Sequence, residues 1–101
     1  MTEEDLLDII LSLSIAIPDS AKSDVQESFF NLLLNLYKNS CCQTLIESIA
    51  VERMPKLDQY SLVHAIALID ASRRPDRDEL LRGFANHDSE LVRQYVRESL
   101  R

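Results

Sequence analysis

The residues of this chain that could carry chemistry are two histidines and one pair of adjacent cysteines. His64 lies in a mostly apolar segment and His87 lies in a turn, and neither stands at a short spacing from a cysteine. A zinc site needs several such ligands at short, regular spacings, so we expect no metal and no cofactor. Most histidines beside an apolar helix face are hydrogen-bonded packing residues, and we assign that role to His64.

The adjacent cysteines, Cys41 and Cys42, stand near the start of an expected helix, where the helix dipole could favour a thiolate. A nucleophile would also need a base and an oxyanion hole. With Gly83 as its one glycine, the sequence offers no glycine-flanked serine turn and no phosphate loop. We therefore predict a non-enzymatic chain with structural thiols, no catalytic residues and no small-molecule substrate. An enzyme would require a polar pocket in which His64 meets a cysteine or an aspartate.

The scarcity of glycine also indicates the fold class. Sheets and tight hairpins use residues that tolerate positive φ, so one glycine in 101 residues favours helices joined by short turns. A hydrophobic content of 46% can supply one core, and we expect a single domain over residues 1–101.

The N-terminal apolar run, residues 9–17, does not resemble a secretory signal, because acidic residues precede it. It is also far shorter than the ~20 residues that cross a bilayer, so we expect no membrane contact. Two neighbouring cysteines do not make a disulfide framework, which indicates a reducing, cytoplasmic location.

Six helices are expected, over residues 3–17, 24–38, 41–53, 59–72, 76–86 and 89–101. Thr2 and Asp58 are typical N-caps for the first and fourth, and Asp88 or Ser89 for the sixth. Capping boxes are predicted for three others, from Ser23 with Gln26, Ser40 with Gln43, and Asp76 with Glu79. Alternate helices start at intervals of roughly 30 to 38 residues, the range of helical-repeat units.

The last hairpin, residues 76–101, has the most specific pattern. Its residues Leu80-Leu81, Phe84-Ala85, Asp88, Val92-Arg93, Val96 and Leu100 resemble a HEAT repeat of the short bacterial type. In that family a turn aspartate and an arginine early in the second helix help to tie neighbouring repeats together, which is the role that the resemblance implies for Asp88 and Arg93. The earlier hairpins share only length and apolar spacing, and Val63 is followed by His64 where the family has arginine.

We therefore expect an all-α fold, with six helices as three antiparallel hairpins stacked in a HEAT-like superhelix. A compact six-helix bundle, such as a death-fold domain, is the alternative.

The formal net charge of −6 resides in residues 1–58, which contain ten acidic and four basic residues. Residues 59–101 contain seven of each sign, and all seven bases are arginines. Arg93, Arg97 and Arg101 share one helix face. We expect local ion pairing of the arginines, because an acidic excess opposes nucleic-acid binding. Nucleic-acid binding through the arginine face is only the third interpretation.

The first two expected helices carry more apolar surface than one neighbouring hairpin needs. A terminal repeat normally has a polar outer face, so the surplus predicts a second contact, with core burial as the other explanation. The predicted partner-binding residues are Ile9, Leu13, Phe30 and Leu34, with Arg93 and Arg97 on the last helix.

These features predict a small protein-interaction module, an adaptor or assembly component, that binds another protein or itself as a homodimer. The alternative is an inhibitor of the immunity or antitoxin kind, in which an acidic patch occludes a basic partner protein. That patch would comprise Glu3, Glu4, Asp5, Asp8, Asp24 and Glu27.

Overall fold

The computed structural model describes residues 2–18 and 20–100, and over these residues it contains helices and no strand. The α-helices are α1 (Glu3–Ala16), α2 (Ser23–Lys38), α3 (Gln43–Arg53), α4 (Gln59–Ala71), α5 (Arg77–Arg82) and α6 (Glu90–Ser99). One 3₁₀ turn, η1 (Met54–Lys56), follows α3. The prediction of an all-α fold with six helices is confirmed.

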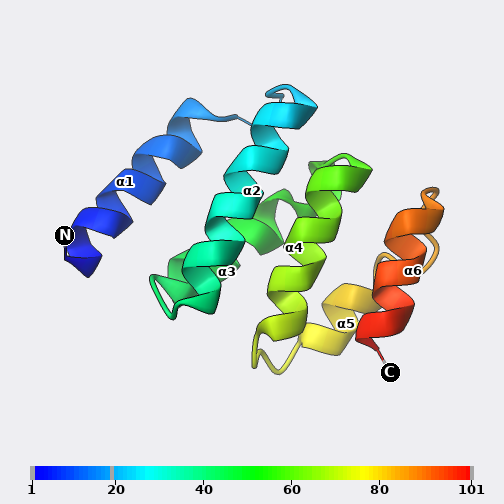
Figure 1. Ribbon diagram of the computed structural model, residues 1–101. Helices are drawn as coiled ribbons and strands as arrows, with labels where there is room; N and C mark the ends of the chain where they lie inside the picture. Colours follow the sequence, from blue (N-terminus) through cyan, green and yellow to red (C-terminus); the bar gives the residue numbers. More distant parts are fainter. Residues whose placement is uncertain (1, 19, 101) are drawn as a thin grey trace.

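Three helices, α2, α4 and α6, lie side by side with α4 in the middle, and α3 and α5 lie behind them (Figure 1). Helix α1 forms one end of the row, beside α2, and α6 forms the other end. The Cα atoms extend over 39 × 29 × 17 Å, so the body is flat.

Helix α4 is the centre of the core because it packs against α2, α3, α5 and α6. Its buried residues therefore lie on several sides of the helix, which explains a segment that is apolar nearly all round: Leu62, Ala65, Ile66, Leu68 and Ile69. Burying one such leucine or isoleucine side chain contributes about 1.5–3 kcal/mol. Helix α2 adds Phe29, Phe30, Leu33 and Tyr37 to the same core.

Three helix starts are capped as the sequence predicts. The Thr2 hydroxyl accepts a hydrogen bond from the Asp5 N–H (3.2 Å), while the Asp5 carboxylate accepts one from the Thr2 N–H (3.1 Å). Asp58 accepts from the Ser61 N–H over 3.0 Å at the start of α4. Ser89, rather than Asp88, caps α6. Each of these contacts joins residues three positions apart, so the local sequence is enough to specify it.

The capping box predicted from Ser23 and Gln26 is wrong. Helix α2 begins without a side-chain cap, and the Ser23 hydroxyl instead donates to the Asp58 carboxylate at the start of α4. Gln26 is buried, and its amide donates to the Pro18 carbonyl over 2.7 Å. Both side chains bind partners distant in the sequence, and those contacts replace the local ones.

The capping box predicted from Ser40 and Gln43 is also wrong, and α3 begins at Gln43 rather than near residue 41. Ser40 and Cys42 both have positive φ, 60° and 53°, so the chain turns sharply between α2 and α3. An N-cap needs extended backbone, and this left-handed turn does not provide it. The Gln43 amide donates instead to the Tyr37 carbonyl over 3.1 Å.

Helix α5 is shorter than the predicted span of residues 76–86. The Asp76 carboxylate does not cap it, because that carboxylate accepts two hydrogen bonds from Arg74, at 2.9 and 3.2 Å. From Gly83 onward the N–H groups of Phe84 and Ala85 bond three residues back, which converts the last predicted turn of helix into tight turns. The predicted end of α6 at Arg101 lies outside the described residues.

Candidate functional site

Helix α1 packs one side against the core and leaves several other large apolar side chains exposed. Ile10 is its one buried residue among those described. Ile9 and Leu11 are 42% and 46% exposed, and Ile15 is 82% exposed. Exposure of apolar side chains to water is unfavourable. The end of the row that α1 forms is therefore a candidate contact surface.

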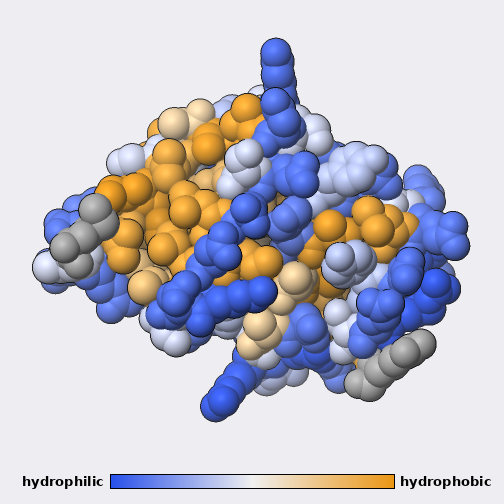
Figure 2. All heavy atoms as spheres, in the orientation of Figure 1, coloured by the Kyte–Doolittle hydropathy of each residue, from blue (hydrophilic) through white to orange (hydrophobic). Residues whose placement is uncertain are grey.

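Two shallow hollows meet on α1 and α2. The first, of about 380 Å³, lies between the two helices and is lined by Leu13, Ile17, Asp24, Val25, Ser28, Phe29 and Leu32. The second, of about 360 Å³, lies on α1 and is lined by Asp8, Ile9, Ser12, Leu13 and Ala16. They share Leu13, so they form one surface, which we call the apolar face. Figure 2 shows the corresponding gathering of apolar residues over α1 and α2.

The charged residues that line the apolar face are both acidic, Asp8 and Asp24. Over its whole length α1 carries four acids and no base. The surface is therefore apolar in its middle and negative at its edge.

The structure separates the predicted contact residues of the first two helices. Ile9 and Leu13 line the apolar face, as expected of a contact surface. Phe30 is fully buried and Leu34 is half-buried against the core, so Phe30 is a core residue and does not lie on the surface of the folded chain. The reason is that Phe30 lies on the side of α2 that packs against the rest of the core.

Sequence reasoning missed Val25 and Leu32, which are each 41% exposed on the apolar face. With Phe29 they stand at i, i+4 and i+7, which is the spacing of one helix stripe. That signal was present in the sequence, but a second apolar stripe on the same helix, containing Phe30 and Leu33, competes with it.

The predicted arginines lie at the other end of the row. The Arg93 guanidinium donates to the main-chain carbonyls of His87 (2.6 Å) and Asp88 (3.0 Å), so it fastens the turn before its own helix. The acceptor at Asp88 is thus its main-chain carbonyl oxygen. Arg97 is exposed on α6. Helices α2 and α4 lie between α1 and α6, so these arginines do not join the apolar face.

The arginines near α5 pair locally, as the charge balance predicts. Arg77 forms ion pairs with Asp70 and Asp78, and it also donates to the Ser99 carbonyl over 2.8 Å. This cation therefore joins the end of α4 to the start of α5 and the end of α6.

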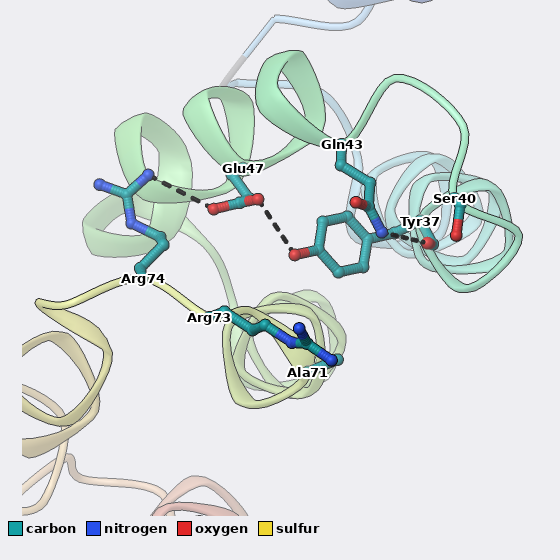
Figure 3. A pocket seen from close by; sticks show the side chains of 7 residues that line it. All are labelled: Tyr37, Ser40, Gln43, Glu47, Ala71, Arg73 and Arg74. Carbon is teal, nitrogen blue, oxygen red and sulfur yellow. Dashed lines mark hydrogen bonds and ion pairs between the residues drawn. The ribbon is translucent and has the colours of Figure 1, made fainter.

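A polar pocket of about 530 Å³ lies where α2 ends, between α3 and the end of α4 (Figure 3). The Tyr37 hydroxyl donates to Glu47 over 3.0 Å, and Arg74 lies 3.7 Å from the same carboxylate. Burial raises the pKa of Tyr37, and the hydrogen bond to Glu47 raises it further. The remaining lining residues are Ser40, Gln43, Ala71 and Arg73.

An enzyme of the kind considered from the sequence would need His64 beside a cysteine or an aspartate in a polar pocket. Neither a histidine nor a cysteine lines this pocket. His64 lies half-buried with Nδ1 2.8 Å from the Tyr60 carbonyl of its own helix. The Ser89 N–H donates to Nδ1 of His87 over 3.0 Å. Burial raises the pKa of the Cys42 thiol, and the nearby Glu3 carboxylate raises it further, which disfavours the thiolate.

Within residues 2–18 and 20–100 no cluster of three histidine, cysteine or acidic side chains is placed to hold a metal ion. In the same part of the chain, no helix has the length and apolarity needed to traverse a bilayer. No protein-family model matches the chain, and comparisons with curated proteins and with solved structures find no match.

Proposed function

We propose that this chain is a non-enzymatic protein-interaction module, an adaptor or assembly component, that docks through the apolar face over α1 and α2. The observation that carries the proposal is the exposure of Ile9, Val25 and Leu32 on two adjacent helices, around two hollows that share Leu13. Exposed apolar groups gathered in this way mark contact surfaces more often than isolated ones do.

The proposed architecture is a stack of three HEAT-like hairpins. The side-by-side order of α2, α4 and α6 supports it, since these are the second helices of successive hairpins. In a stack each hairpin covers its neighbour, and a terminal hairpin needs either a polar outer face or another contact. Helix α6 carries charged residues on its outer side, whereas α1 does not cover its own apolar stripe.

The test is recovery of a bound protein from the native cell, followed by reconstitution of the purified pair. Ile9→Glu and Leu32→Glu each place a charge on the apolar face, and we expect each to weaken binding at least about tenfold. Tyr95→Glu is the matched control, because Tyr95 is similarly exposed but lies on α6, at the other end of the row. Circular dichroism should show unchanged helicity in all three. If Ile9→Glu and Leu32→Glu both bind with unchanged affinity, the contact lies on another surface.

Self-association is the second form of the same function. The concentration dependence of the sedimentation coefficient measures it directly, and a dimer through the apolar face should dissociate in the Leu32→Glu variant. A dimer that survives this substitution would use a different surface.

An inhibitor of the immunity or antitoxin kind is the alternative function. The acids of α1 favour it, since Glu4 and Asp8 are exposed and no base lies on that helix. An inhibitor that captures a basic partner should bind with strong salt dependence, whereas an apolar contact should tolerate salt. Measuring the dissociation constant at two salt concentrations separates the two functions. For either function, the free thiols of Cys41 and Cys42 support a reducing, cytoplasmic setting.

A further inference from the structure

We infer that the apolar face receives an amphipathic helix of another protein, one whose apolar stripe is flanked by lysine or arginine. This inference rests on the proposed docking function and specifies its partner.

The shape of the surface suits a helix. From Ile9 to Ala16 the chain advances seven residues along α1, or about 10 Å at a rise of 1.5 Å per residue. From Val25 to Leu32 it advances seven residues, or about 10 Å. Three anchors at i, i+4 and i+7 on a docking helix span about 10 Å, which matches both rows. A partner strand is less suited, because the main-chain groups of α1 and α2 are already bonded within the helices and offer no edge.

The charge of the surface indicates which residues should flank the apolar stripe of the docking helix. Asp8 lines the hollow on α1, and Asp24, in the first turn of α2, lines the crevice between the helices. Since α1 and α2 run in opposite directions, these two carboxylates lie toward opposite ends of the apolar face (Figure 1). No basic residue lines either hollow. A helix with bases beside its apolar stripe would therefore meet an acid at each end.

The same charges oppose a second copy of this chain as the occupant. Two copies placed face to face would bring Asp8 and Asp24 of one near those of the other. Helix α1 has four acids and no base with which to relieve that repulsion. Like charges across an interface disfavour the pairing, so a basic partner fits better.

The experiment uses the whole chain and a displayed library of helical peptides. Every peptide carries leucine at i, i+4 and i+7, and the flanking positions vary among lysine, glutamate, glutamine and serine. Selected peptides are then synthesised, and their affinities are measured by fluorescence anisotropy at two salt concentrations. Sedimentation of the free chain is measured alongside.

We expect the selected peptides to be enriched in flanking lysine and to lose at least about tenfold in affinity for the Leu32→Glu variant. The double variant Asp8→Asn with Asp24→Asn should lose about 2- to 30-fold in affinity for lysine-flanked peptides, and nothing for glutamine-flanked ones. Glu4→Gln is the matched control, because Glu4 is an exposed acid of α1 that lines neither hollow.

Three results would overturn the inference. Equal recovery of lysine, glutamate and glutamine flanks, with Leu32→Glu still abolishing binding, would refute the basic partner but leave the docking function intact. A dimer of the free chain that Leu32→Glu dissociates would make a second copy the occupant. If no helical peptide binds, or if the selected peptides bind the Leu32→Glu variant equally well, the proposed helical partner is refuted. If the protein recovered from the cell also binds the Leu32→Glu variant equally well, the docking function is refuted too.

Discussion

The Arg53 guanidinium, at the end of α3, donates to the Ser14 carbonyl of α1 over 2.6 Å and to the Ser14 hydroxyl over 3.1 Å. It also lies 5.3 Å from the centre of the Phe29 ring in α2 and within 3.4 Å of the Gln26 amide oxygen. One buried cation thus connects three helices. This contact adds to the packing of Leu6, Leu7, Ile10 and Leu13 against the core in holding α1 against the body.

Replacing Arg53 with methionine keeps much of its volume but removes these donors. We expect a loss of about 1.5–3 kcal/mol in the free energy of unfolding, the usual contribution of hydrogen bonds to a charged group. Urea denaturation measures the loss, and hydrogen exchange should become faster in α1 than in α4. Arg82→Met is the matched control, because Arg82 is an exposed arginine of α5. Unchanged exchange in α1 would show that other contacts hold it.

Glu3 of α1 binds the residue that precedes α3. Helix α3 has no side-chain cap of its own, and the Glu3 carboxylate accepts from the Cys42 N–H over 3.1 Å. Glu3→Ala should therefore cost about 0.5–1.5 kcal/mol, the usual net contribution of one hydrogen bond. Glu4→Ala, in the same first turn of α1, should change stability by less than about 0.5 kcal/mol. Thermal unfolding of both variants compares them, and equal losses would mean that the effect belongs to α1 alone.

Asp58 should make stability depend on pH in the acid range. Burial raises its pKa, but the hydrogen bonds that Ser23 and Ser61 donate outweigh burial, and the folded pKa lies below its ordinary value of about 3.9. A lowered folded pKa means that the carboxylate's contribution is complete above the unfolded pKa and disappears as the pH falls through the folded one.

Asp58→Asn should therefore be less stable than the parent at pH 7, and the difference should shrink below about pH 4. Urea unfolding at pH 7, 5, 4 and 3 measures it. Asp88→Asn, at an exposed position in a turn, is the control substitution. A difference that is constant with pH would remove the carboxylate charge as the cause.

The adjacent cysteines should differ in reactivity. Cys42 is 4% exposed and its thiol pKa is raised, chiefly by burial, whereas Cys41 is half-buried. Since the thiolate is the reactive form, iodoacetamide should modify Cys41 about tenfold faster or more. Cys41→Ser should abolish the fast phase and Cys42→Ser should leave it. Faster labelling of Cys42 would contradict the buried position of its thiol.

Phe30 and Ile9, both expected as contacts, should behave differently on substitution. Phe30 is fully buried, so Phe30→Ala should cost about 3–5 kcal/mol and Phe30→Glu should unfold the chain. Ile9 is exposed on the apolar face, so Ile9→Ala should change stability by no more than about 0.5 kcal/mol. Circular dichroism with urea measures both, and a folded Phe30→Glu variant would show that α2 can turn this side chain outward.

The contacts that the sequence predicted correctly are local ones. Thr2 and Asp58 each cap a helix through an N–H three residues ahead, and that geometry follows from the chain itself. Ser23 and Gln26 have the same spacing, yet the hydroxyl of Ser23 binds a carboxylate 35 residues away. No spacing rule contains such a partner, because the folded arrangement of α2 and α4 creates it.

The sequence by itself determined that this protein is helical, since its apolar periodicity, its caps and its single glycine act within a few residues. It also indicated a surplus of apolar surface on the first two helices, with core burial as the other explanation. Only the tertiary structure decided which apolar stripe of α2 remains exposed. Phe30 and Leu33 contribute to the core, while Val25 and Leu32 stay partly in solvent. A helix that is apolar on two sides has no local preference between them, so packing against α4 makes the choice.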